Sequence, residues 1–444
     1  MTTSATPISP VTAVQGDRRT MRRVAASVMV GTTIEWYDFI LYGSAAALVF
    51  GPLYFPSGNV TVQTLLSFST FAVGFGARPL GGLILGHIGD RVGRKAVLFL
   101  SLTMMGVATF LIGLLPTHAS IGIAAPLILV LLRLVQGFGV GGEWGGAVLT
   151  AVEQASPRTR GFYGALPQMG VPLGLLTATS VFFAFRQMPE DDFMSWGWRV
   201  PFLFSIVLVI IGLFVRSKLE DTPAFQSVKA KDEVRKVPVL VAIKTYPKQI
   251  LLATGSMIST GAYFYGVNTF ALAYASTSGK QTSSAMLLAV LASAVAAAAA
   301  IPMFGAYGQR RGRRMTIVAG LGAMTLWIFP TFMAIDSGNM LLLVLAYVVG
   351  ALFFAVSYGP QATFIAELFD ASVRFTAASV SFQMGVLIGG ALTPIVATSL
   401  VGATGTSFSV AAYISALSVL SLVCVLSISR RDRERGAADI GGVE

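Results

Sequence analysis

A basic ten-residue motif occurs twice in this chain, about half a chain length apart. The first copy, residues 86–95, reads GHIGDRVGRK, and the second, residues 305–314, reads GAYGQRRGRR, 219 positions later in a chain of 444 residues. Each copy is a short basic turn between two long apolar stretches. Two similar apolar halves are the sequence signature of a secondary transporter, because a pathway can form where the repeats meet.

The composition excludes a soluble globular protein. Hydrophobic residues make up 55% of the chain and charged residues only 11%, whereas soluble domains average about 25% charged residues. Most of the chain must therefore face lipid or other helices. Because a run of about 20 apolar residues can cross the hydrocarbon core as a helix, we predict an all-α integral membrane protein with about twelve transmembrane helices in two pseudo-symmetric six-helix halves.

The apolar runs divide the chain into five parts. We predict an N-terminal tail over residues 1–23, a first half over 24–217, a linker over 218–247, a second half over 248–429 and a C-terminal tail over 430–444. The predicted spans are 24–54, 62–89, 95–115, 123–154, 161–185, 199–217, 248–276, 283–308, 314–335, 339–368, 374–401 and 407–429.

The net charge of +11 follows the predicted topology. Of the 31 Lys and Arg residues, 26 lie in the two tails, the two motif turns, the stretch 216–248 and at positions 158, 160 and 374. The connections that alternate with these segments are nearly free of Lys and Arg. This positive-inside pattern places both termini and the linker in the cytoplasm, in a multi-pass protein of the inner (cytoplasmic) membrane, and it argues against nucleic-acid binding.

Five charged residues lie in the interior of predicted spans, away from the span ends, and all five are in the first half. They are Glu35, Asp38, Arg78, Arg133 and Glu143. An ionisable group in hydrocarbon costs at least about 2.5 kcal/mol, so it normally pairs, faces a cavity or serves a pathway. The first half should therefore hold any proton site, with Arg133 in reach of Asp38 and Arg78 in reach of Glu35 or Glu143.

Chemistry of other kinds has no support in the sequence. It contains no P-loop, no nucleophile–base set and no metal-ligand spacing; His87 and His118 are far apart, and the single Cys424 cannot form an intramolecular disulfide. We expect no enzymatic activity, no metal and no cofactor. The expected partners are a small-molecule substrate, protons and the lipid bilayer, with the monomer as the functional unit.

The motifs resemble a known family. The first basic turn fits G-x-x-x-D-R-x-G-R-K, the loop signature of the major facilitator superfamily, and the resemblance covers essentially the whole chain. Residues 35–39 (EWYDF), 78–82 (RPLGG), 136–138 (QGF) and 141–146 (GGEWGG) resemble the metabolite:proton symporter family within it, most of all its shikimate-type members. That family carries shikimate, 2-oxoglutarate, citrate and betaine or proline, so the resemblance implies a symporter that imports a small organic acid.

The resemblance also assigns roles at the cytoplasmic side. Asp90 is expected to latch the inside closed, and its counterpart in the second copy is Gln309, which cannot form an ionic latch, so the gate should be asymmetric. A second repeated pattern, Glu153 with Arg160 and Glu367 with Arg374, is expected to add charged partners at the same cytoplasmic gate. The predicted gating residues are Gly86, Gly89, Asp90, Arg91, Gly93, Arg94, Glu153, Arg160, Arg310, Arg313, Glu367 and Arg374.

Two further groups of residues are assigned to proton coupling and substrate binding. By resemblance to proton-coupled sugar porters, Asp38 and Arg133 form the coupling pair, with Glu35 and Glu143 as the next candidates. Arg78 is favoured for an anionic substrate because its planar fork matches a carboxylate. The other predicted substrate-binding residues are neutral donors and acceptors: Tyr42, Gln136, Tyr263, Asn268, Gln361 and Gln383.

Three other functions are compatible with the sequence. The same fold could export a substrate against protons, or import an osmolyte such as betaine or proline. The long C-terminal coiled-coil tail of the osmosensing members is absent here. A sensor that transports nothing would be expected to carry a large soluble signalling domain, and no such domain is present in the sequence.

The charge pattern predicts where both tails lie. A single cysteine placed in either tail should stay protected from an impermeant maleimide in intact cells and react after the cells are opened. Labelling of both tails from outside would contradict the topology.

Overall fold

The structure is a computed structural model that describes residues 18–92, 94–141, 148, 151–152, 155–156, 158–217, 244–370 and 373–429. For residues 18–27, 83, 86–92, 94–96, 98 and 216–217 it describes only the course of the backbone. All regular elements in these ranges are helices. Lipid offers no hydrogen-bond partners to the backbone, whereas a helix pairs its N–H and C=O groups within its own segment.

The first half of the described chain contains six long helices and several short ones. They are α1 (Arg18–Leu48), α2 (Phe50–Tyr54), α3 (Val60–Val92), α4 (Arg94–Leu114), α5 (His118–Ile121), α6 (Ala124–Val140), α8 (Arg160–Arg186), α9 (Glu190–Asp192), the π-helix η1 (Phe193–Gly197) and α10 (Arg199–Ser217).

The second half repeats this plan. Its helices are α13 (Pro247–Tyr265), the π-helix η2 (Gly266–Phe270), α14 (Ala271–Ser278), α15 (Ser283–Arg311), α16 (Arg313–Asp336), α17 (Met340–Ala366), α18 (Arg374–Val386), the π-helix η3 (Leu387–Ala391), α19 (Thr393–Thr404) and α20 (Phe408–Ser427).

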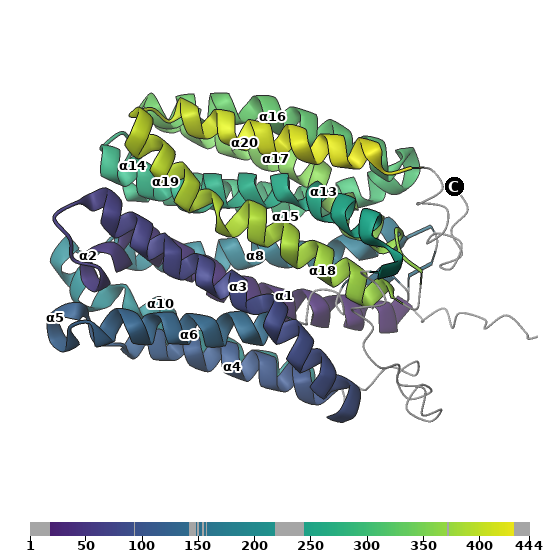
Figure 1. Ribbon diagram of the computed structural model, residues 1–444, viewed down its shortest axis with the longest axis horizontal. Coiled ribbons are helices and arrows are strands. Elements are labelled where there is room, and N and C mark those ends of the chain that lie inside the picture. The colour runs from purple at the N-terminus through teal and green to yellow at the C-terminus, as the bar shows by residue number, and fades with distance from the viewer. Residues whose placement is uncertain are drawn as a thin grey trace, which may run out of the picture.

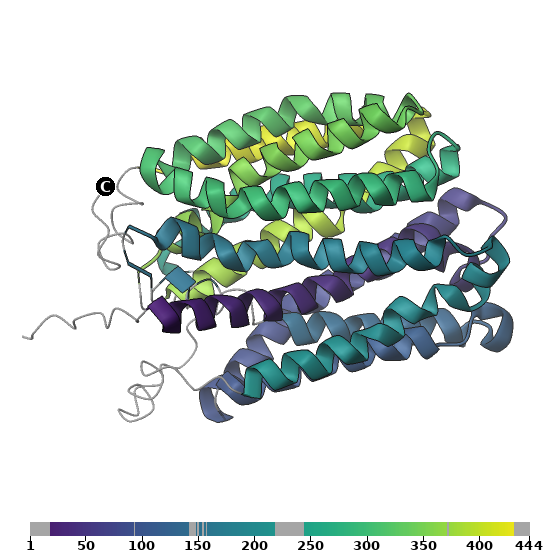
Figure 2. The ribbon, with the colours of Figure 1, turned by 180° about the vertical axis from the view of Figure 1, so that it is seen from behind.

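The long helices run lengthwise beside one another in two groups, one from each half of the chain (Figure 1). The view from behind shows α8 and α15 side by side where the groups meet (Figure 2). Helices α1, α3 and α8 face α13–α14, α15 and α18–α19 across this interface. We call the end where α8, α16 and α18 begin the basic end, after Arg160, Arg313 and Arg374, and the end with α2, α5 and the α14–α15 connection the opposite end.

The predicted membrane architecture is confirmed. Within the described ranges, eight helical segments are long and apolar enough to cross a membrane, and η1 with α10 gives a ninth, bent by 41°. The shorter apolar stretches Phe99–Leu114 and Ala124–Val140 coincide with two further predicted spans. Two details differ from prediction: the run 24–54 breaks at Val49 into α1 and α2, and the acidic stretch after Arg186 is helical.

The first span of each half is interrupted once, and the two interruptions fall at equivalent positions. Span seven changes from α- to π-helix at η2, which contains Asn268, and the break at Val49 lies 219 residues earlier (268 minus 49). This is the spacing of the two basic motifs. A π-bulge marks a local departure from regular hydrogen bonding and is frequent at functional sites.

The basic motifs form helix ends joined by one residue rather than extended turns. Helix α3 continues to Val92 and α4 begins at Arg94, while α15 continues to Arg311 and α16 begins at Arg313. The linking Gly312 has φ +96°, a conformation that disfavours side chains with a Cβ. Gly312 therefore allows α15 and α16 to reverse direction within one residue.

Glycines bring the backbones of α3 and α6 into direct contact. A Cβ added at Gly137 would overlap the carbonyl oxygen of Gly74, and one added at Gly141 would overlap that of Arg78. In lipid the hydrophobic effect does not drive helices together. Small residues at a crossing allow close van der Waals packing, which stabilises the helix pair instead. The α3–α6 contact holds Arg78 and Arg133 on neighbouring backbones.

This contact predicts a contrast between two glycines. Gly137→Ala should lower the thermal stability of the detergent-solubilised protein, by about 1–3 kcal/mol if the helices part enough to admit the methyl group. Gly76→Ala is the matched control, because a Cβ there meets no described atom within 4 Å. Equal melting temperatures for the two variants would contradict the packing argument.

Candidate functional site

A cluster of charged side chains lies buried inside the first group of helices. Asp38 on α1, Arg78 on α3 and Arg133 on α6 are only 1%, 2% and 0% exposed, and Glu35 is 5% exposed. Asp38 lies within electrostatic range of Arg133 and Glu35, and Arg78 within range of Glu35. The structure therefore brings together four of the five ionisable residues that the sequence singled out.

Arg133 is held by a short chain of hydrogen bonds. Its Nη1 donates to Oε1 of Gln136 at 3.1 Å, and Nε2 of Gln136 donates to Oγ1 of Thr109 on α4 at 2.7 Å. On the other side, Gly74 lies so close that an added Cβ would overlap the guanidinium. Arg133 is thus fixed between α3 and α4.

Aromatic rings surround both guanidinium groups. The guanidinium carbon Cζ of Arg78 lies 3.9 Å from the ring centre of Phe39 and 4.3 Å from that of Phe75. Cζ of Arg133 lies 4.2 Å from the same Phe39 ring centre and 4.3 Å from that of Tyr42. The two cations therefore cannot be more than 8.1 Å apart, the sum of their distances to Phe39. Ring faces attract cations, which offsets part of the cost of burying them.

Tyr265 brings the second half of the chain to this cluster. Its ring centre lies 5.4 Å from that of Phe71 and 5.5 Å from that of Phe75, across the interface between the two groups of helices. Its hydroxyl is buried and has no hydrogen-bond partner among the described residues. Tyr265 was not among the residues predicted to bind substrate. Its role here, and that of the phenylalanines, was missed because aromatic residues are common in any apolar span.

Much of the hydrogen-bonding capacity of the cluster is unused. In the described part of the chain, neither carboxylate oxygen of Asp38 accepts a hydrogen bond, and Nε of Arg78 and Nε and Nη2 of Arg133 donate none. A buried polar group without a partner costs free energy, more so when it is charged. Such groups are available to a proton or to an anionic ligand.

The predicted pair Asp38–Arg133 is near but not joined by a direct hydrogen bond. Arg133 directs Nη1 to Gln136 instead, and its guanidinium stacks on aromatic rings. The long Arg side chain, which made contact with Asp38 plausible, is occupied by these interactions. The role of Asp38 and Arg133 in coupling stays a prediction.

The predicted substrate-binding residues of the second half take different places. Gln383 donates to the carbonyl of Gly141 at 3.5 Å and so bridges the two halves. Gln361 donates to Ser256 O at 2.8 Å and Asn268 to Phe264 O at 2.9 Å. The amide oxygens of all three are buried without a hydrogen-bond partner among the described residues.

Two other residues predicted to bind substrate, Tyr263 and Tyr42, make different contacts. The hydroxyl of Tyr263 points to Gly350 within the second half. Tyr42, in the first half, has its hydroxyl 2.6 Å from Thr70 Oγ1. Its ring, rather than its hydroxyl, faces Arg133.

The basic end holds an ion pair that the sequence did not predict. Arg313 pairs with Glu367, and both side chains are 11% exposed. Arg313 also donates to Gln309, the residue that replaces Asp90 in the second motif. Arg374, the expected partner of Glu367, donates through Nε to the carbonyls of Ala366 and Phe369, each at 3.0 Å.

Arg160 brings the first half to this end of the molecule. Its Nε donates to Val152 O at 3.4 Å, and it lies within electrostatic range of Glu367, Arg313 and Arg374. Arg310 is exposed. Nearby, a Cβ at Gly161 would overlap the carbonyl of Gly305, so the two halves touch through their backbones where the second motif begins.

Several predicted residues lie outside what the structure describes. Gly93, Glu143 and Glu153 are not described at all, and only the backbone is described for Gly86, Gly89, Asp90, Arg91 and Arg94. Their assignments stay predictions.

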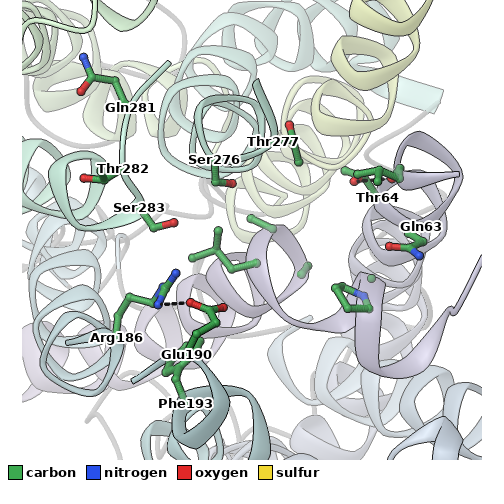
Figure 3. Close-up of a pocket in the computed structure, with 16 residues that line it drawn as sticks. Gln63, Thr64, Arg186, Glu190, Phe193, Ser276, Thr277, Gln281, Thr282 and Ser283 are labelled. Carbon is green, nitrogen blue, oxygen red and sulfur yellow. Dashed lines mark hydrogen bonds and ion pairs between the residues drawn. The ribbon is translucent and has the colours of Figure 1, made fainter. Parts of the chain in front are cut away.

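A cavity of about 430 Å³ lies between the two halves at the opposite end (Figure 3). Arg186 and Glu190 form an ion pair of 2.7 Å on its first-half wall, and Ser276 and Ser283 line the second-half wall. Beside it, Nε2 of Gln187 donates to Ser284 Oγ at 3.2 Å and links the halves. We call this cavity the vestibule; it is lined by residues of both halves.

Comparison with known proteins identifies the family. The family described as "Sugar (and other) transporter" matches residues 24–250, and "Major Facilitator Superfamily" matches residues 257–442. The chain belongs to the major facilitator superfamily. It is a multi-pass membrane transporter of about twelve helices and not an enzyme, as predicted.

The relatives are metabolite transporters. The chain is 38% identical over 411 residues to the inner membrane metabolite transport protein YhjE of Escherichia coli (strain K12), covering 91% of this chain and 93% of that protein. It is 38% identical to the shikimate transporter of the same strain, covering 93% and 95%. It is 32% identical to the proline/betaine transporter of Salmonella typhimurium, covering 92% and 83%.

Solved structures agree in fold. The xylose transporter XylE of E. coli, in a partially occluded inward open conformation, matches with a TM-score of 0.71 at 17% identity, covering 91% of this chain and 96% of that one. The proton:xylose symporter XylE bound to 6-bromo-6-deoxy-D-glucose also matches with a TM-score of 0.71.

The position of Arg133 can be tested without changing any charge. Gly74→Ala should displace the guanidinium that an added methyl group would overlap, and should lower the rate of substrate uptake by membrane vesicles about tenfold, equivalent to about 1.4 kcal/mol. Gly76→Ala, on the open face of the same helix, should transport normally. Immunoblotting would show equal insertion of both variants. Normal uptake by Gly74→Ala would contradict the assignment of Arg133 to the transport site.

Proposed function

We propose that this protein is a proton-coupled symporter that imports a small organic acid, such as shikimate or a dicarboxylate, by alternating access. The observation that carries the proposal is the pair of buried guanidinium groups, no more than 8.1 Å apart, that retain unused N–H donors beside an unbonded carboxylate. The relatives of this chain include a shikimate transporter, which supports the same substrate class.

Arg78 is the proposed anchor for the substrate carboxylate. Its Nε has no described partner, and its plane lies against Phe39 and Phe75. A planar guanidinium binds a carboxylate through two parallel hydrogen bonds. The substrate hydroxyls would then reach the open amide oxygens of Gln361 and Gln383 across the interface.

The charges of the cluster give a reason for symport. When Asp38 is ionised, its negative charge opposes a second anion in the same buried site, because Coulomb interactions are strong at low dielectric. Protonation removes this charge while Arg78 and Arg133 remain, so the site then favours an anion. Proton and anion thus favour the binding of each other, and such coupling is reciprocal.

The location of the cluster suits alternating access. Tyr265 and Gln383 belong to the second half yet reach the first half, so rocking of one half against the other would expose the cluster first to one end and then to the other. We assign the basic end to the cytoplasm from the positive-inside pattern. The vestibule of Figure 3 is then the external entrance.

An osmolyte such as betaine is the second candidate, favoured by the relatives named proline/betaine transporters. Its quaternary ammonium would require free aromatic faces. The rings of Phe39, Phe75 and Tyr42 already lie against guanidinium groups. The cluster therefore favours a net anion over a zwitterion.

Uptake by right-side-out membrane vesicles would distinguish an organic-acid importer from an exporter and from an osmolyte carrier. With an imposed inward proton gradient, right-side-out vesicles should accumulate labelled shikimate, 2-oxoglutarate or citrate in preference to betaine. Accumulation that instead requires an opposite gradient would identify an exporter, and preference for betaine would identify an osmolyte carrier.

Asp38→Asn tests the site of the proton. The amide mimics a permanently protonated carboxyl, so the variant should lose uphill accumulation and keep the exchange of internal for external substrate, which needs no net proton movement. Asp191→Asn on the exposed α9 is the control and should behave as the parent protein. If Asp38→Asn still accumulates substrate uphill, Glu35 and Glu143 become the candidates for the proton site.

A further inference from the structure

Thr109 occupies a position that the motifs of the sequence do not mark. It lies near the end of α4, is fully buried, and its Oγ1 is placed beside Asp38 on α1 and in hydrogen-bond contact with Gln136 on α6. It is therefore the side chain that lies between Asp38 and the hydrogen bonds that hold Arg133. A role for Thr109 in coupling rests on the proposed function and deepens it.

The hydrogen bonds that hold Arg133 have only one possible direction. A guanidinium donates and never accepts, so the amide of Gln136 must turn its oxygen to Arg133, which it does at 3.1 Å. Its NH₂ group then faces Thr109, and Oγ1 of Thr109 must accept, at 2.7 Å. The hydroxyl of Thr109 therefore keeps a single proton for one further acceptor.

Two acceptors compete for that proton. In this structure the hydroxyl donates to the carbonyl of Met105 at 2.9 Å, one turn earlier in α4. The carboxylate of Asp38 lies beside the same hydroxyl, and both its oxygens lack a partner among the described residues. An ionised carboxylate is a stronger acceptor than a carbonyl that already accepts within its helix. A protonated carboxyl is not.

We propose that Thr109 and Gln136 form a hydrogen-bonded bridge that links Arg133 to Asp38 only while Asp38 is ionised. When Asp38 is ionised, the Thr109 hydroxyl turns to it, and the bridge joins Asp38 to Arg133 in one continuous chain. When Asp38 takes up a proton, the hydroxyl turns to Met105, the acceptor that it has in this structure. Arg133 keeps its bond to Gln136 but is no longer linked to a charged carboxylate, and its unbonded Nε and Nη2 are available to an anion.

The charged groups around Asp38 are consistent with this role. Glu35 lies on the same helix and Arg133 on α6, while Arg78 on α3 is a neighbour of Arg133. Tyr37, beside Asp38 in the chain, directs its hydroxyl to Pro201 O at 2.6 Å and is engaged elsewhere. Thr109 is thus a positioning residue that acts through Gln136 and Arg133.

Three substitutions test the bridge. Thr109→Val keeps the shape and removes the hydroxyl, Thr109→Ser restores the hydroxyl, and Thr103→Val is the control. Thr103 lies on the same helix, is exposed, and donates to Phe99 O at 2.8 Å in the same manner as Thr109 to Met105. Each purified variant would be reconstituted in proteoliposomes with the organic acid that the parent protein accumulates best.

The measurement is the ratio of uphill, proton-driven accumulation to substrate exchange at equal pH. Thr109→Val should lower this ratio about tenfold, equivalent to about 1.4 kcal/mol, with exchange changed by no more than about twofold. Thr109→Ser and Thr103→Val should keep the parental ratio. A merely structural role would lower accumulation and exchange together and leave the ratio unchanged.

Two results would overturn the bridge. One is an unchanged ratio in Thr109→Val, whether both activities persist or both fall. The other is failure of Thr109→Ser to restore the ratio. If the parent protein accumulates no organic acid under a proton gradient, the proposed function itself is wrong. If the parent protein and Thr109→Val both accumulate it equally well, the proposed function stands and only the bridge is wrong.

Discussion

The burial of two guanidinium groups in an apolar helix bundle is the constraint on which the rest of the structure depends. Arg78 and Arg133 are at most 2% exposed, aromatic rings lie against both guanidinium groups, and Gln136 accepts a hydrogen bond from Arg133. A charge in this setting is costly unless something compensates it. In the proposed function, an organic anion that enters from water supplies that compensation.

Other features of the molecule serve this arrangement. The glycine contacts between α3 and α6 bring the two arginine-bearing backbones together, and Gly74 leaves the space in which Arg133 lies. The π-helical segment η2 interrupts α13 directly after Tyr265, the residue that extends the cluster into the second half. At the basic end, Arg313 pairs with Glu367 within the second half, and the backbone contact of Gly161 with Gly305 joins the two halves.

The sequence predicted the class of fold and the members of the cluster, but not their contacts. Apolar runs, the repeated motif and the Lys and Arg distribution report on membrane insertion, which depends on composition along the chain. Ionisable residues in spans stand out because they are costly there. By contrast, the ion pair of Glu367 with Arg313 and the hydrogen bond of Arg133 to Gln136 depend on helix rotation and tilt, which the sequence does not report. Thr109 carries no signal at all, and Phe39 is marked only as the last residue of the motif 35–39, since hydroxyl and aromatic residues are ordinary in a membrane span.

The central claim is that a proton and an organic anion favour the binding of each other at the buried cluster. The most direct measurement is proton uptake on substrate binding, followed with a pH indicator in weakly buffered detergent solution near neutral pH. The account predicts uptake of about one proton for each substrate bound by the parent protein, and none by Asp38→Asn with binding retained. Binding of the anion without proton uptake, or equal proton uptake by the parent protein and Asp38→Asn, would contradict it.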